Sequence, residues 1–181
     1  MNIHQLNVSH VDREDRLLLR LNTRSAEEFR FWLTRRLALR LLPALDQAVG
    51  RLESSTPGVM APDPASKQIL TEIKRDEFMQ KADFKTPYAE QAQKLPMGEE
   101  PMLVTDVQLH FQGQGIQITL QDKGAPGSQA RSCQLNLPAS MVHGLIHLVR
   151  QAMEKAQWQG AQEAAPAAES GLSETATGYR H

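Results

Sequence analysis

The sequence predicts an α+β protein made of two βββα units, each an antiparallel sheet followed by a packed helix. In residues 1–55, three runs of alternating apolar and polar residues precede a run with helical spacing, and residues 103–158 repeat that order. The stretch between them is rich in proline, glycine and serine at its start. We therefore expect a first unit at 1–55, a linker at 56–102, a second unit at 103–158 and a tail at 159–181.

The first unit begins with strands expected near residues 5–10, 16–21 and 29–33. Apolar side chains occupy every second position of these runs, and the charged stretch 12–15 separates the first two. From Thr34, a reasonable N-cap, leucine and alanine recur every three or four residues, which predicts an amphipathic helix. Pro43 falls inside this helix, so we expect either a kink or a second helix that starts near it.

The second unit follows the same plan, with strands expected near residues 107–111, 116–120 and 133–137. Residues 113–115 form the turn between the first two, and Pro138 opens a helix with a broad apolar face. The two units align with offsets that differ by five residues, the extra length of the second loop. This agreement in pattern indicates an internal duplication, with chance convergence of two ordinary units as the alternative.

The linker contains one amphipathic helix, expected at about residues 64–82, with Ile69, Ile73 and Phe78 on its apolar side. The tail at 159–181 consists mainly of alanine, glutamate, glycine and serine. Such a segment has little to bury, so we expect it to be disordered.

The charge of the chain is balanced overall but not locally. Twenty lysines and arginines face 21 aspartates and glutamates, which argues against a protein that coats DNA without sequence preference. Residues 1–52 hold nine arginines and six acids, net +3, whereas residues 53–102 hold six bases and nine acids, net −3. The middle segment could therefore neutralise the first unit.

Cysteine usage and hydropathy predict a cytoplasmic protein with no membrane contact. Cys133 is the single cysteine, which excludes an internal disulfide and a multi-cysteine zinc site. The N-terminal residues lack the apolar core of a secretory signal, and no run approaches the length of a transmembrane helix.

Candidate catalytic groups are few. His143 and His147 lie four residues apart on the second helix, a spacing that lets two imidazoles face one metal ion. Glycine occupies position 144, where zinc hydrolases place a glutamate, and a third ligand would have to come from Cys133, His110 or Asp106. Because the pair falls on the helix side that carries Arg150 and Glu154, we expect both histidines to be solvated instead.

Other catalytic signatures are absent from the sequence. The glycines at 113 and 115 join two strands, whereas a dinucleotide-binding loop needs a strand-to-helix junction. Cys133 occupies an inward position of its strand, so a buried structural thiol is a better interpretation than a nucleophile. The sequence therefore offers no positive support for an enzyme, implies no cofactor, and favours noncatalytic binding.

The strongest candidate for a binding surface is the outer face of the first sheet together with the start of its helix. Leu18, Arg20, Arg30 and Trp32 occupy that face, and Arg36 and Arg40 follow on the helix. The matching sheet positions of the second unit are uncharged and polar: Gln117, Thr119, Gln134 and Asn136. This contrast separates the six residues from the scaffold that the two units share.

Three interpretations of that surface remain open. An exposed leucine and tryptophan rimmed by arginine are typical of an interface with a protein partner or a second copy. Arginines beside an aromatic on a sheet can also hold phosphates and stack an unpaired base, which is the alternative of single-stranded nucleic-acid binding. In the third interpretation, the acidic middle segment folds over the sheet, covers Trp32 and pairs with the four arginines Arg20, Arg30, Arg36 and Arg40.

The run DREDRLLLRLNTRSAEEFRFWLTRRLALRLLPAL, about the first quarter of the chain, resembles small uncharacterised proteobacterial proteins. The resemblance implies no activity, but it raises the expectation that the arginines and Trp32 form a surface specific to that group. In topology alone, tandem units of strands followed by a helix resemble Whirly and Pur single-strand nucleic-acid binders. Those proteins have four strands in each unit, one more than we expect here.

Overall fold

The computed structural model of the chain describes residues 2–54, 63–82, 86–89, 94–124 and 130–158. It contains two sheets and three helices, so the predicted α+β class and its order of three strands followed by a helix are confirmed. The first half contains β1 (Ile3–Val11), a 3₁₀ turn (Asp12–Glu14), β2 (Arg16–Thr23), β3 (Glu28–Thr34) and α1 (Arg35–Ser54). The remainder contains α2 (Pro64–Lys81), β4 (Met102–Leu103), β5 (Asp106–Gln112), β6 (Gly115–Asp122), β7 (Arg131–Pro138) and α3 (Ala139–Lys155).

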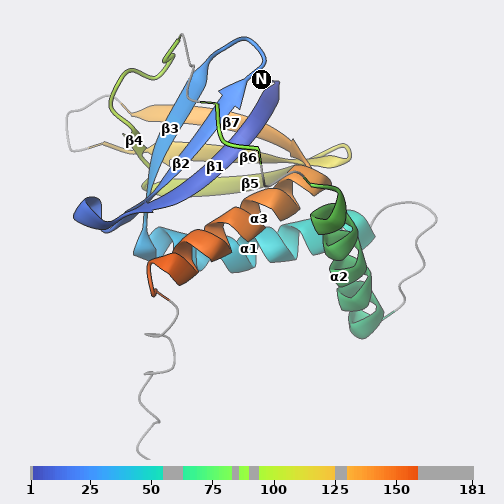
Figure 1. The fold of residues 1–181 in the computed structure, drawn as a ribbon. Helices are drawn as coiled ribbons and strands as arrows, with labels where there is room; N and C mark the ends of the chain where they lie inside the picture. Colours follow the sequence, from blue (N-terminus) through green and yellow to red (C-terminus); the bar gives the residue numbers. More distant parts are fainter. Residues whose placement is uncertain (1, 55–62, 83–85, 90–93, 125–129, 159–181) are drawn as a thin grey trace, which may run out of the picture.

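The strands form two separate sheets. The first has the order β1-β2-β3-β4, in which β1 to β3 are antiparallel and β4 runs parallel to β3. The second is the antiparallel meander β5-β6-β7. In Figure 1 the second sheet lies behind the first, and α1 and α3 cross beneath both. β1 is therefore an edge strand of the first sheet.

One hydrophobic core is shared by the two halves of the chain. Alternate residues of β2 and β3 are fully buried, among them Leu17, Leu19, Leu21 and Phe31, because period-two alternation places them on one face of the sheet. The inward residues of β6 and β7 belong to the same cluster, including Ile116, Ile118, Leu120, Leu135 and Leu137. The apolar stripes of α1 and α3 complete it.

The helices bind the two halves together by packing across them. α3 lies along β1 and contacts it more extensively than it contacts the sheet from which it emerges. α1 in turn contacts β5 and β6, and α1 and α3 pack against each other. The sequence analysis expected each helix to cover its own sheet, but here each helix also contacts strands of the other half.

Several local predictions can be compared with the structure. The Leu37 amide donates to Thr34 Oγ1 at 3.2 Å, which confirms Thr34 as the cap of α1. Pro43 lies within a single continuous α1, so no second helix starts there. The predicted helix at 64–82 is confirmed as α2. The predicted tail at 159–181 lies outside the described residues.

The short strand β4 was not predicted, because its two residues had been assigned to the end of the linker and the start of the second unit. Met102 is fully buried and pairs with Phe31 across the parallel ladder. A two-residue strand has no detectable alternation, so pattern analysis cannot find it.

Among the described residues, no helix is long and apolar enough to cross a membrane.

Candidate functional site

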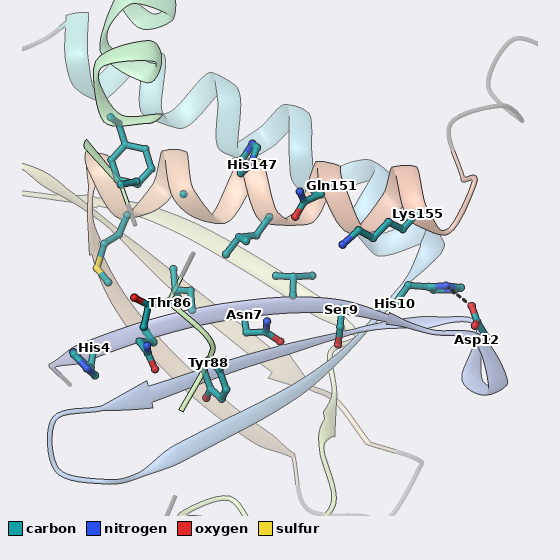
Figure 2. A pocket seen from close by; sticks show the side chains of 18 residues that line it. His4, Asn7, Ser9, His10, Asp12, Thr86, Tyr88, His147, Gln151 and Lys155 are labelled. Carbon is teal, nitrogen blue, oxygen red and sulfur yellow. Dashed lines mark ion pairs between the residues drawn. The ribbon is translucent and has the colours of Figure 1, made fainter. Parts of the chain in front are cut away.

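An open groove with a volume of about 840 Å³ runs between β1 and α3. Figure 2 shows β1 along one side of it and α3 along the other, with the end of α2 and residues 86–88 at one end. Residues from His4 to His10, together with Asp12, line the β1 side. The groove therefore follows almost the whole length of the edge strand.

The edge of β1 is the main chemical feature of this groove. β1 is the longest strand in the described chain, and β2 is its only partner in the sheet. In an antiparallel ladder, every second residue points its N–H and C=O away from the partner strand. β1 contains no lysine, arginine, aspartate, glutamate or proline, the residues with which proteins usually discourage pairing at a sheet edge.

The walls of the groove differ along its length. Leu6 and Val8 of β1 are inward-facing residues, and Met141, Gly144 and Leu148 of α3 lie opposite them. Further along α3 the lining becomes polar, with His147, Gln151 and Lys155 at intervals of four residues. Gln151 and Lys155 extend from α3 toward β1 (Figure 2). An occupant would therefore meet an apolar surface at one end and hydrogen-bonding groups at the other.

Trp158 ties the polar end of the groove together. Its indole Nε1 donates to Asp15 Oδ1 at 3.1 Å, and its ring meets the His10 ring edge-on with centroids 5.5 Å apart. Its carbonyl accepts from Arg35 Nη2 at 3.1 Å. These contacts fix the residues that follow α3 to the hairpin that joins β1 and β2 and to the start of α1.

The apolar end is closed by Phe78 of α2. A Cβ atom built on Gly144 would lie 3.1 Å from Phe78 Cζ, so the absence of a side chain at 144 lets the ring approach α3 closely. The same ring stacks against His143, with centroids 6.5 Å apart. Phe78 thereby connects the groove to the interior between the helices.

His143 is buried, which corrects the expectation that both histidines of α3 are solvated. Its Nε2 lies 3.0 Å from Glu53 Oε1, and both residues are at least 96% buried, with 3% and 4% exposed. The second carboxylate oxygen, Glu53 Oε2, has no hydrogen-bond partner in the described structure. The helical-wheel argument failed because α1 and α2 cover this side of α3.

The structure gives no support to a metal site at this pair. His147 lines the groove, whereas His143 points to Glu53. Within the described ranges, no group of three or more histidine, cysteine, aspartate or glutamate side chains is placed to hold a metal ion.

The six residues proposed as a binding surface fall into two places. Leu18, Arg20, Arg30 and Trp32 lie on the outer face of the first sheet, where Leu18 faces Trp32 and Arg20 faces Arg30 across the β2–β3 ladder. All four are partly buried. Arg36 and Arg40 lie instead on the exposed side of α1, away from the sheet ladder.

Residues 86–89 lie over part of that outer face. The Arg20 guanidinium sits 4.6 Å from the centre of the Tyr88 ring and also donates to Asn7 Oδ1 at 3.3 Å. The Tyr88 hydroxyl donates to the buried carboxylate of Glu28, whose other oxygen accepts from Arg30 at 2.5 Å. Burial, followed by the neighbouring Glu28 charge, raises the pKa of Tyr88. These contacts occupy both arginines within the chain.

Trp32 lies beside the segment that leads out of the linker. Trp32 pairs with Leu103 of β4, and its carbonyl accepts from the Val104 amide at 3.0 Å. Backbone pairing thus holds residues 103 and 104 beside the tryptophan.

Cys133 is buried as predicted, and it lines no part of the groove. Burial raises the pKa of its thiol to about 11. A thiol with that pKa is protonated at neutral pH, which agrees with a structural role.

The comparisons with known proteins give no match: no protein-family model, curated protein or solved structure resembles this chain closely enough to be reported.

The sequence analysis did not identify the groove. On the β1 side, Leu6 and Val8 alternate with polar residues as in any half-buried strand. On the α3 side, Gln151 and Lys155 fit the polar face of an ordinary amphipathic helix. One signal was available, namely the absence of charge and proline from residues 3–11. That absence gains meaning only when the strand is known to lie at an edge.

Proposed function

We propose that this protein is a noncatalytic protein-binding module that accepts an extended chain segment along β1. The observation that carries the proposal is the uncharged nine-residue edge strand bordering an open groove. An added strand would pair with the outward-pointing backbone groups of β1 and lie between β1 and α3.

The groove chemistry supports an extended segment more than a compact ligand. Side chains of a strand alternate between its two faces, so every second residue of an added segment would point toward α3. Those residues would meet Met141 and Leu148 at one end and Gln151 and Lys155 at the other. Backbone pairing would supply affinity, and this graded wall would supply selectivity.

A display library of random linear peptides, selected against the full chain, tests the proposal. Enriched peptides should lose binding when alternate backbone amides are N-methylated, because methylation removes the donors that an added strand uses. Leu148→Ala removes apolar surface from the groove wall and should weaken those peptides about tenfold. Ile69→Ala is the matched control, since Ile69 is 56% exposed on α2 and lies outside the groove.

The proposal fails if the selected peptides bind the Leu148→Ala chain as well as the native one, or if N-methylation leaves their affinity unchanged. Either result would place binding somewhere other than the edge of β1.

Single-stranded nucleic-acid binding through Arg20, Arg30, Trp32 and the helix arginines is the alternative proposal. Arg36 and Arg40 are exposed and could contact phosphates, whereas the intrachain contacts of Arg20 and Arg30 count against a stacking platform at Trp32. Fluorescence anisotropy with single-stranded oligonucleotides at two salt concentrations separates the two proposals. The alternative requires salt-dependent binding at micromolar protein that Arg36→Ala and Arg40→Ala weaken.

A further inference from the structure

The sequence of β1 is nearly symmetric about its central residue. Reading outward from Asn7, residues of like chemistry occur at equal distances on the two sides: Leu6 with Val8, Gln5 with Ser9, His4 with His10, and Ile3 with Val11. From this symmetry we propose that the segment accepted by β1 is β1 of a second copy of the chain, paired antiparallel about a two-fold axis at Asn7. The inference rests on the proposed function and names its partner.

A two-fold antiparallel pair gives this symmetry a physical meaning. Residue i of one strand then faces residue 14 − i of the other, so Asn7 faces Asn7 and Leu6 faces Val8 of the second copy. Two residues that lie directly opposite each other in an antiparallel pair also project on the same side of the sheet. Leu6 and Val8 pair within their own chain with the buried Leu21 and Leu19, so they point inward, whereas Gln5, Asn7 and Ser9 point outward. Apolar residues would meet on the inner face and polar residues on the outer face.

The other exposed edges are less suited to self-pairing. β4 has only two residues, β5 begins with Asp106, and β7 begins with Arg131 and ends with Pro138. Charges and proline at an edge discourage pairing. Among the described strands, β1 is the one that combines length with an uncharged edge.

Residues 86–89 limit how far the paired strands extend. They contact β1 through the Gln5 side chain, which donates to the Pro87 carbonyl and accepts from the Ala89 amide. These contacts are made on the outer face of the sheet, as is the contact of Tyr88 with Arg20 beside Asn7, so we place the shared ladder along the backbone edge of Gln5–Ser9. A ladder of this length buries less than the roughly 800 Å² per partner of a stable complex, so the polar end of α3 must add contacts and the dimer should dissociate in the micromolar range.

Cysteine cross-linking tests the register directly. Asn7→Cys places two thiols opposite each other and should give a covalent dimer on oxidation. Gln5→Cys alone and Ser9→Cys alone should not cross-link, because position 5 of one copy lies about 13 Å along the strand from position 5 of the other, and the same holds for position 9. A mixture of the Gln5→Cys and Ser9→Cys chains should cross-link as a heterodimer. The native chain, with its single buried thiol at Cys133, is the background control.

Asn7→Asp tests the interface without disturbing the monomer. Within one chain the new carboxylate faces Arg20, which already donates to Asn7 Oδ1, so the fold should be retained. Across the two-fold axis it faces a second carboxylate, and sedimentation equilibrium should show dimerisation weakened about tenfold. Asn136→Asp, on the exposed face of β7, is the matched control and should leave the dimer unchanged.

The results distinguish this inference from the function on which it rests. A chain that stays monomeric at its highest soluble concentration, or a dimer that neither cross-links at position 7 nor weakens with Asn7→Asp, overturns the two-fold pairing. If such a chain still binds library peptides that depend on Leu148, the edge accepts a different segment and the proposed function stands. If it binds no such peptide, both proposals fall.

Discussion

Replacing His143 with leucine should destabilise the protein strongly, because it leaves the buried Glu53 without a partner. The imidazole Nε2 is 3.0 Å from Glu53 Oε1, and Glu53 Oε2 has no partner among the described residues. Removing one member of such a pair typically costs about 3–5 kcal/mol, since the remaining group stays buried and unpaired. In a chain of this length each kcal/mol lowers Tm by roughly 2–4 °C. We therefore expect Tm to fall by roughly 6–20 °C.

The double variant His143→Leu with Glu53→Leu should recover most of that loss. Two leucines at this junction of α1 and α3 would replace the polar pair by apolar contacts, which is often neutral or stabilising. Glu53→Leu alone leaves the histidine unpaired and should cost about 1–3 kcal/mol. The sum of the single effects should therefore exceed the effect of the double variant by several kcal/mol.

Urea unfolding at fixed pH, followed by tryptophan fluorescence, measures all four chains of this cycle. The slope of the transition should stay constant, so that midpoint differences report stability alone. Two results would refute the reasoning: a His143→Leu chain within about 1 kcal/mol of the native chain, or single effects that simply add in the double variant. Either would mean that the two side chains are not coupled in the folded protein.

Three further predictions concern other buried or partly buried side chains. Burial raises the pKa of Cys133 from 9.0 to about 11, so alkylation of this thiol at pH 8 should be about a hundredfold slower in the folded chain than in urea; equal rates would contradict the burial. Because the unfolded chain loses the thiol proton at a lower pH than the folded chain, the free energy of unfolding should fall as pH rises from about 9 to 11. Gly144→Ala should stabilise a Phe78→Leu chain by about 1 kcal/mol, because alanine has the higher helix propensity. In the native chain the gain should be smaller or absent, because the new alanine Cβ would lie 3.1 Å from Phe78; equal gains in urea unfolding would refute the contact. With Trp158→Phe, the half-buried Trp32 should show acrylamide quenching between that of a core and a free indole, and quenching at the free-indole rate would contradict its packing beside β4.

The sequence predicted the elements of this protein well because their signals are local. Thr34 caps α1, and alternating leucines mark β2, since both depend on neighbours only a few residues away. β4 was missed because a parallel pair of two residues depends on a strand 71 positions earlier in the chain. A sequence pattern does not identify the distant strand or helix against which an element packs.

The candidate site was harder to predict for the same reason. Position 143 was expected to be solvated because Arg150 and Glu154 share its side of the helical wheel, but α1 supplies Glu53 and α2 supplies Phe78 to bury it. The outer face of the first sheet was identified correctly as the place where Arg20 and Trp32 lie. Its cover by Tyr88 depends on how a loop returns over the sheet, which no periodicity encodes.

The groove exists because α3 packs along β1 of the first half as well as against the sheet that it follows. Its floor and edge come from β1, in the first half, and its opposite wall comes from α3, in the second. Had α3 covered only the sheet it follows, β1 would be a bare edge with no wall to select an occupant. The arrangement also places Trp158, at the end of α3, against Asp15 at the end of β1, so the two walls are tied at one end while the groove stays open along its length. Trp158 is itself only 3% exposed and belongs to the same hydrophobic core, so loss of this tie should lower the stability of the fold as well as impair binding at the groove.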